Sequence, residues 1–245
     1  MVVLRHLPVC ECGGGREGRK LRPASLPDTP GGDHAWTMKK LALIVLFAGA
    51  VYYQFFVGQP IGAYADDGAP KTILFTTGQC GNACDETRRY LLRRKIDFEE
   101  HDAFDHGPGT DLYKKYGGSG YMPMVTMGRQ RVIGHNPGGI ISALAIEFGP
   151  AHIKSGELSA LQRNFDGANE PRVVMYATAW CGYCKKARQY FTDNGIEFVE
   201  YDIEKDRAAE RDYDTLLGSG TPLLYQGYTR VVGFDQRTIE RDFNL

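Results

Sequence analysis

In the C-terminal third of the chain, hydrophobic and polar positions form a regular succession of strand-like and helix-like patterns. Wholly apolar short runs indicate buried strands, alternating runs indicate half-exposed strands, and apolar positions three or four apart indicate helices. After the helix-like run 184–194, Gly195 is suited to end the helix. The predicted strand, helix, strand, helix, strand, strand and helix cover residues 173–176, 184–194, 196–201, 206–217, 223–225, 230–232 and 236–243.

The middle of the chain repeats the motifs of the C-terminal third in the same order. Cys80 lies nine positions after Lys71, as Cys181 lies nine positions after Arg172. The further matching segments are 96–102 with 196–202, 117–123 with 217–222, and 131–134 with 230–233. Agreement over about 70 residues indicates two copies of one small domain.

Each copy is predicted to form a mixed sheet flanked by helices, because strands alternate with helices before a final hairpin. The two copies cover residues 70–149 and 170–245, and residues 150–169 join them. The sequence therefore predicts an α/β protein of two tandem domains.

The N-terminal part shows neither pattern. Residues 1–37 are rich in glycine and proline without any period, which is typical of a disordered extension. Residues 38–65 resemble an export signal or a membrane anchor. A basic start at 38–40 is followed by an almost wholly apolar stretch, 41–57, and by the small-residue pattern Ala63-Tyr64-Ala65 of a signal-peptidase site.

Cleavage and retention of this segment are both open. The apolar part of a cleaved signal has about 7–15 residues, and a membrane-spanning helix needs about 17–25, so residues 41–57 lie on the border. An uncleaved segment would bind the membrane through residues 41–57. Because the preceding lysines stay inside, both outcomes place residues 66–245 on the non-cytoplasmic side, in the cell envelope. In a bacterium that compartment is the periplasm, with or without an inner-membrane anchor.

Charge and cysteine content limit the chemistry. The formal net charge of −1 gives no basic excess, so no nucleic-acid partner is expected. Six cysteines are too few for a disulfide scaffold of this length. Cys80 with Cys84 and Cys181 with Cys184 form closely spaced pairs, and such spacing favours redox or metal chemistry over structural crosslinking.

The pair Cys181 and Cys184 is predicted to be a redox dithiol. Cys181 follows a strand and opens a helix, whose unpaired N–H groups and dipole stabilise a thiolate. Cys181 is therefore the predicted nucleophile, helped by the positive charges of Lys185 and Lys186. Cys184, one turn further, would attack the resulting mixed disulfide and release the substrate. The same spacing is also half of a zinc site, but no second ligand pair follows in this copy, so no metal is predicted.

Cys80 and Cys84 are a candidate second redox pair with one extra intervening residue. Positions four apart on a helix have Cβ atoms about 5–6 Å apart, against about 3.5–4.5 Å in a disulfide. Cys80 would have to lie in the loop before the helix for the pair to bridge. Three interpretations stay open for this copy: a redox centre with altered properties, a binding or scaffolding module, and a stable disulfide or metal site.

Three motifs in the second copy resemble the glutaredoxin family of the thioredoxin fold. They are residues 176–184 (Tyr-Ala-Thr-Ala-Trp-Cys-Gly-Tyr-Cys), Thr221-Pro222 and Gly233-Phe234-Asp235. The resemblance implies two tandem thioredoxin-like domains, the first diverged, and a cis Pro222 that faces the nucleophile. The family holds the glutathione carboxylate with backbone N–H groups, next to an acidic side chain, after a glycine turn. The implied substrate and glutathione site consists of Trp180, Tyr183, Thr221, Pro222, Gly233, Phe234 and Asp235.

The resemblance implies an enzyme with no bound cofactor that reduces protein disulfides or glutathione mixed disulfides. Glutathione is one candidate electron donor. Gly182 stands where the family usually has proline, and Val232 where its pattern has a second glycine. Gly233-Phe234 also resembles glutaredoxin-like proteins served by thioredoxin reductase, so a thioredoxin-type donor stays open. The alternative functions are a non-catalytic interaction or scaffold protein and a metal-binding module.

Overall fold

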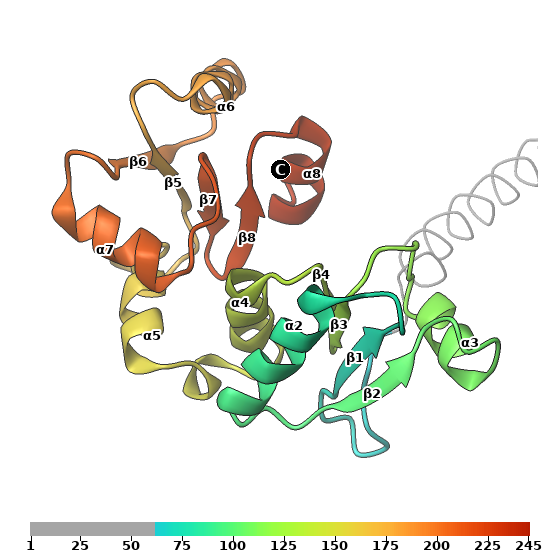
Figure 1. Cartoon of the computed structure of the whole chain (residues 1–245). Helices are drawn as coiled ribbons and strands as arrows, with labels where there is room; N and C mark the ends of the chain where they lie inside the picture. Colours follow the sequence, from blue (N-terminus) through green and yellow to red (C-terminus); the bar gives the residue numbers. More distant parts are fainter. Residues whose placement is uncertain (1–61) are drawn as a thin grey trace, which may run out of the picture. The chain divides into compact units, whose positions relative to one another are not determined.

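The computed structural model of the chain describes residues 62–245, which form the two sheets drawn in Figure 1. The predicted extension 1–37 and the apolar stretch 41–57 lie outside the described residues. Among the described residues, no helix is both long enough and apolar enough to cross a membrane. Both sheets belong to one compact unit.

The first sheet has the strand order β2-β1-β3-β4. Its central strand β1 is buried at every position, and it pairs in parallel with β2 and antiparallel with β3. The strands are β1 (Thr72–Thr76), β2 (Glu99–Asp102), β3 (Met124–Met127) and β4 (Gln130–Ile133). The helices of this copy are α2 (Asn82–Arg93), α3 (Pro108–Lys115) and α4 (Pro137–Glu147).

The second sheet repeats this topology in the order β6-β5-β7-β8. Its strands are β5 (Val173–Ala177), β6 (Phe198–Asp202), β7 (Leu223–Gln226) and β8 (Thr229–Val232). The helices are α6 (Gly182–Asp193), α7 (Arg207–Thr215) and α8 (Gln236–Phe243). The predicted order of strands and helices is thus confirmed in both copies, and the mixed sheets agree with two thioredoxin-like domains.

One boundary differs from the prediction for a local reason. The strand expected from residue 196 begins at Phe198, because the end of α6 uses the backbone N–H groups of Gly195 and Ile196. Gly195 has a φ of 65° and donates to the carbonyl of Thr192, and the Ile196 N–H donates to the carbonyl of Phe191. This pair of bonds is the Schellman motif, which needs a left-handed residue and so favours glycine there.

The hydrophobic core lies on both faces of the central strands. On one face of the second sheet, Met175 packs with Phe191 of α6 and Ile239 of α8, all fully buried. On the other face, Tyr176 and Tyr225 join a cluster that also contains Ile140 of α4 from the first copy. The two copies therefore share one core. A central strand that is buried on both faces has a continuous apolar run in its sequence, as residues 73–75 of β1 and 173–177 of β5 do.

The connection between the copies contains structure of its own. Residues 150–169 include the short 3-10 helix η2 (Pro150–His152) and the helix α5 (Ser155–Gln162), which packs on α7. Glu157 of α5 forms a buried ion pair with Arg94, the residue after α2, and Arg163 pairs with Asp212 of α7. The connection thus ties the first copy to the second.

The two copies pack closely at Gly138 of α4, so we expect that replacing this glycine destabilises the chain. A Cβ atom on Gly138 would lie 2.8 Å from the carbonyl oxygen of Leu216 and 2.8 Å from Cζ of Arg230. Helix propensity alone predicts that Gly138→Ala stabilises the chain by about 1 kcal/mol. We expect instead a loss of ~1–3 kcal/mol in the free energy of unfolding, because the site is overpacked. Denaturant unfolding of the full chain measures the change.

The control is Gly167→Ala, where a Cβ would meet nothing within 4 Å. This substitution should change the free energy of unfolding by less than about 0.5 kcal/mol. Equal effects of the two substitutions would contradict the close approach at Gly138.

The predicted signal-peptidase pattern lies at the edge of the described residues and is part of the first copy. Ala63 is fully buried, its N–H donates to the carbonyl of Gly128 at 2.7 Å, and its carbonyl accepts from Lys71 at 2.8 Å. The Tyr64 hydroxyl donates to Glu147 at 2.9 Å. Cleavage after Ala65 would remove all of these contacts from the domain.

Candidate active site

The two cysteines predicted to act as a dithiol lie where β5 passes into α6. Cys181 is the N-cap residue of α6, and it forms a disulfide with Cys184 with a Cα–Cα distance of 5.2 Å. The Cys184 N–H donates to Sγ of Cys181 at 3.0 Å. Cys181 is 5% exposed and Cys184 is fully buried, so the predicted nucleophile is the more accessible of the two. The structure shows the oxidised form of the pair.

The predicted proline step lies against the same sulfur. The Thr221–Pro222 peptide bond is cis, as the resemblance implied. The Thr221 carbonyl oxygen lies 3.4 Å from Sγ of Cys181, and the Pro222 carbonyl accepts from the Gly233 N–H at 2.8 Å. Backbone atoms before β7 and after β8 are thereby held beside the disulfide.

An exposed aromatic residue directly precedes each cysteine of the disulfide in sequence. Trp180 is 71% exposed, and its indole N–H donates to Oε1 of Glu204 at 2.8 Å. Tyr183 is also exposed, and Nζ of Lys186 lies 5.3 Å from its ring centroid. The sequence did not indicate a role for Glu204, because the contact joins residues 24 positions apart that share no local pattern. Its effect is to fix the orientation of the indole ring.

The predicted glycine turn lies between β8 and α8. Gly233 has a φ of 82°, a conformation that favours glycine, and the half-buried Phe234 packs on Tyr190 at a ring distance of 5.9 Å. Asp235 is the N-cap of α8 and accepts from the Thr238 N–H at 2.8 Å. Hydrogen bonds from the Thr238 side chain and backbone hold the pKa of Asp235 below its ordinary value. The exposed start of α8 can bind an anion through its free N–H groups.

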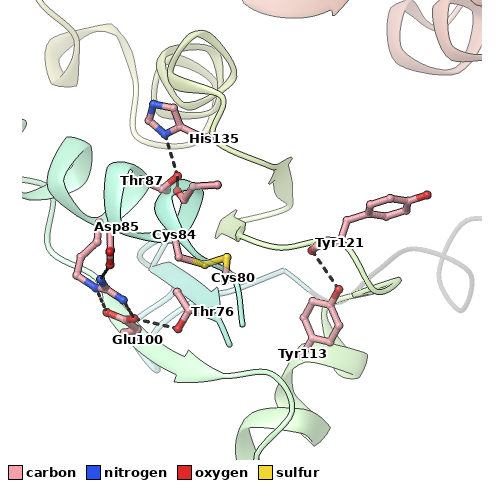
Figure 2. The surroundings of a disulfide bond; sticks show 11 residues. Thr76, Cys80, Cys84, Asp85, Thr87, Glu100, Tyr113, Tyr121 and His135 are labelled. Atoms are coloured by element: carbon pink, nitrogen blue, oxygen red, sulfur yellow. Dashed lines mark hydrogen bonds and ion pairs between the residues drawn. A yellow bond between two sulfur atoms is a disulfide. The ribbon is translucent and has the colours of Figure 1, made fainter. Parts of the chain in front are cut away.

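In the first copy, Cys80 and Cys84 form a disulfide with a Cα–Cα distance of 5.7 Å, drawn in Figure 2. Cys80 lies outside α2, which meets the condition that the sequence analysis set for bridging. Gly81 makes this possible with a φ of 60° at the helix cap. The Met122–Pro123 bond is cis, like its counterpart in the second copy. Near the disulfide, Thr87 is hydrogen-bonded to Nδ1 of His135 at 2.9 Å.

Within residues 62–245, no group of three or more histidine, cysteine, aspartate or glutamate side chains could hold a metal ion.

Known proteins resemble part of this chain. The sequence profile of the glutaredoxin family matches residues 173–228. A glutaredoxin of Pseudomonas aeruginosa is 36% identical over 66 residues, which are 26% of this chain and 79% of the relative. A glutaredoxin-like 8.6 kDa protein from the rubredoxin operon of Clostridium pasteurianum is 27% identical over 70 residues, 28% of this chain and 93% of the relative. The crystal structure of a glutaredoxin from Archaeoglobus fulgidus aligns with a TM-score of 0.28 and 20% identity, covering 30% of this chain and 87% of that one.

The strand-to-helix position of the cysteines, the cis proline beside Cys181 and the glycine turn before α8 are the three motifs from which the resemblance started. The Pseudomonas relative is 36% identical to this chain over 79% of its own length. Together with the two sheets of equal topology, this match shows that the chain belongs to the glutaredoxin family and carries two tandem thioredoxin-fold domains.

Proposed function

We propose that this protein is a thiol–disulfide oxidoreductase that acts through Cys181 and Cys184. Its substrates are disulfide-containing proteins or glutathione mixed disulfides. The observation that carries the proposal is the N-cap position of Cys181, whose sulfur accepts the Cys184 N–H at 3.0 Å. The same N–H and the helix dipole stabilise a thiolate after reduction. The neighbouring Lys185 and Lys186 are exposed and add positive charge.

The reaction follows from the difference in accessibility of the two sulfurs. The Cys181 thiolate attacks one sulfur of the substrate disulfide, whose S–S bond breaks and whose other sulfur leaves as a thiol. Cys184 then attacks the mixed disulfide at Cys181, which releases the second substrate thiol and forms the Cys181–Cys184 disulfide. The substrate has gained two electrons and two protons. Two glutathione molecules restore the dithiol and leave as glutathione disulfide.

Glutathione is the proposed electron donor, and the start of α8 is its proposed carboxylate site. The backbone N–H groups after Gly233 are exposed there, next to the Asp235 carboxylate, and an anion is stabilised at such a helix end. Thr221, with its carbonyl 3.4 Å from Cys181 Sγ, would offer backbone hydrogen bonds to the peptide part of glutathione. Pro222, Phe234, Trp180 and Tyr183 would border the bound molecule.

Asp235→Ala is expected to weaken glutathione binding, whereas the same substitution at the N-cap of another helix is not. The Asp235 carboxylate would accept a charge-assisted hydrogen bond from the ammonium group of glutathione, and its loss should raise the KM for glutathione about tenfold with little change in kcat. The control is Asp206→Ala, which removes the N-cap of α7, where Asp206 accepts from the N–H groups of Ala208 and Ala209. Steady-state kinetics of the full chain would show an unchanged KM for Asp206→Ala, while both variants lose a similar, small amount of thermal stability. Equal KM values in both variants would contradict a site at α8.

The experiment that tests the function compares donors with the full chain. Reduction of a glutathione mixed disulfide is followed with glutathione and glutathione reductase, and in parallel with thioredoxin and thioredoxin reductase. Turnover with glutathione supports the proposed donor. Turnover only with the thioredoxin system leaves the oxidoreductase and overturns glutathione as donor. Absence of turnover with both, in a chain whose Cys181–Cys184 pair is chemically reducible, would leave the scaffold interpretation.

We also propose that the chain stays anchored in the membrane through residues 41–57, with residues 66–245 on the non-cytoplasmic side. The burial of Ala63 and its two backbone hydrogen bonds support retention, because cleavage after Ala65 would remove them from the first domain. The test is the N-terminal sequence and the protease accessibility of the chain in envelope membranes. Recovery of a chain that begins at Asp66 would contradict the anchor.

A further inference from the structure

We propose that Cys80 and Cys84 form a second redox centre, which exchanges its disulfide with cationic polypeptide dithiols rather than with glutathione. The proposal rests on one feature that the two copies share and two in which they differ. The position of the sulfurs is shared. The charge of the first helical turn and the accessibility of the start of the last helix differ.

The position of the sulfurs agrees with a redox role. The Cys80–Cys84 disulfide lies between β1 and α2, as Cys181–Cys184 lies between β5 and α6. Cys84 is 3% exposed, and Cys80 is half-buried, so an incoming thiolate reaches Cys80 first. The left-handed Gly81 takes up the extra residue, because it leaves Cys84 in the first turn of the helix, as Cys184 is. In both disulfides the first cysteine is therefore more accessible than the second.

The charge of the first helical turn is opposite in the two copies. Cys184 is followed by Lys185 and Lys186, and Cys84 is followed by Asp85 and Glu86, with all four side chains exposed. Asp85 is partly neutralised by Arg88 at 2.6 Å, and Arg88 in turn pairs with Glu100. Figure 2 labels the two carboxylates, Asp85 and Glu100. Asp85 and Glu100 thus share one guanidinium, and Glu86 adds an exposed carboxylate in the same helical turn. With the exposed Arg89, these five side chains carry three negative and two positive charges. Such a surface repels anions such as glutathione and attracts cationic partners.

The N-terminus of α4, the last helix of the first copy, has no exposed N–H groups that could bind an anion. Asn136 caps α4, and its side-chain oxygen accepts from Gly139 at 2.9 Å and from Nη1 of Arg230 at 3.3 Å. Pro137 has no N–H, and Gly138 is buried against the second copy near Arg230. The counterpart of the exposed α8 terminus is therefore covered by the interface between the copies, and a small anionic thiol finds no carboxylate site there.

The surface beside the first disulfide instead suits a larger partner. Tyr121, just before the cis Met122–Pro123 step, is 68% exposed, and its ring points outward in Figure 2. Its carbonyl accepts from the Tyr113 hydroxyl at 3.3 Å, which holds the backbone of this loop. Phe104 is 48% exposed, and its ring centroid lies 6.1 Å from that of Tyr113. Aromatic side chains contribute strongly to polypeptide interfaces, and tyrosine among them is also able to hydrogen-bond.

The exchange step balances as follows. A thiolate of the partner dithiol attacks Sγ of Cys80, the Cys80–Cys84 bond breaks, and Cys84 leaves as a thiolate that takes up a proton. The partner's second thiolate attacks the mixed disulfide and releases Cys80, which is also protonated. The partner has lost two electrons and two protons as its own disulfide forms, and the first copy has gained them.

The test uses the full chain, because trypsin separates the two centres. Cleavage after Lys71 and Arg88 gives one peptide with Cys80 and Cys84, and cleavage after Arg172 and Lys185 gives another with Cys181 and Cys184. The oxidised native chain is treated at low salt with one of three reductants: glutathione, a synthetic dithiol peptide flanked by lysines, and the same peptide flanked by glutamates. Free thiols are then alkylated, and mass spectrometry gives the reduction rate of each pair.

We expect the lysine peptide to reduce Cys80–Cys84 at least about tenfold faster than the glutamate peptide, the lower end of charge steering, and the preference to weaken at high salt. Glutathione should reduce this pair at least about tenfold more slowly than it reduces Cys181–Cys184. Glu86→Lys should lessen the preference for the lysine peptide. Glu210→Lys, the same charge change on the exposed face of α7, should leave it unchanged.

Two results would overturn the proposal. Equal rates with the two peptides, or faster reduction by the glutamate peptide, would exclude a cationic partner. A Cys80–Cys84 pair that no reductant opens before the chain is denatured would be a structural disulfide. The Cys181–Cys184 peptide reports separately on the proposed function, since its failure to react with glutathione would leave the result for the first pair unaffected.

Discussion

Cys181→Ser is expected to abolish disulfide reduction by the full chain, with a fall in turnover of at least ~10³-fold, because no other accessible thiolate lies in the second copy to start the exchange. The Thr221 carbonyl and the Cys184 N–H would stay in place around the serine hydroxyl, which is not a nucleophile toward disulfides at neutral pH. The measurement is glutathione-dependent reduction of a mixed disulfide under saturating donor. The variant should also fail to form a stable mixed disulfide with substrate.

Two matched variants separate the roles of the sulfurs. Cys184→Ser keeps the attacking sulfur but removes the buried one, so mixed disulfides at Cys181 should accumulate and be released only by an external thiol. Cys84→Ser opens the other disulfide and should leave glutathione-dependent turnover within about twofold of the parent chain. Loss of that turnover in Cys84→Ser, with Cys181→Ser still active, would place the reaction in the first copy and contradict the proposed function.

Glu157→Ala is expected to lower the free energy of unfolding by ~3–5 kcal/mol, because it leaves a guanidinium buried without its partner. Arg94 donates to both carboxylate oxygens of Glu157, at 2.6 and 2.8 Å, and the two side chains are only 6% and 7% exposed. Glu157 also accepts from the Lys154 N–H at 3.0 Å, so α5 loses its capping interaction as well. Denaturant unfolding of the full chain measures the loss.

The double variant Arg94→Met and Glu157→Leu is the control for this prediction. It removes both charges, and the replacement of a buried ion pair by apolar side chains of similar volume is often neutral within about 1 kcal/mol or stabilising. A double variant as unstable as Glu157→Ala would mean that the pair itself, rather than an uncompensated charge, carries the stability. The same result would contradict the reason given for the large single effect.

The pH dependence of this ion pair has a defined direction. Burial by itself raises the pKa of Glu157, but hydrogen bonds from Arg94 and the Lys154 N–H outweigh it and hold the pKa below the ordinary value of 4.5. A depressed carboxylate pKa means that the unfolded chain binds the proton more tightly. The stabilisation is therefore complete above pH 4.5 and is lost as the pH falls through the lowered value. The parent chain should lose stability in that range more steeply than the double variant.

If both proposals hold, the two disulfides react with different partners: Cys181–Cys184 with glutathione, and Cys80–Cys84 with cationic polypeptide dithiols. The second copy combines lysines beside its disulfide with a free α8 terminus, and the first combines carboxylates with a covered α4 terminus. The covering comes from the packing of the copies, so the same interface that stabilises the chain also sets the proposed difference in partners. Under this proposal, the tandem arrangement sets the partner of the diverged copy.

The local pattern of the sequence determined the order of the elements and the position of the dithiol. Apolar runs such as 173–176 and helical spacing over 184–194 each depend on neighbouring residues, and so does the placement of Cys181 at a strand-to-helix junction. The repeat determined that there are two copies, since it compares one part of the chain with another. The cis bond at Pro222 came from the family resemblance and is confirmed.

Only the tertiary structure decided whether Cys80 bridges to Cys84, because that depends on the left-handed conformation of Gly81 and on where α2 begins. It also decided that Glu204 holds Trp180 and that Arg230 covers the start of α4. These contacts join residues 24 and 94 positions apart. The first contact depends on how the elements of the second copy pack, and the second on how the two copies pack. Periodicity within a short window carries no information about either.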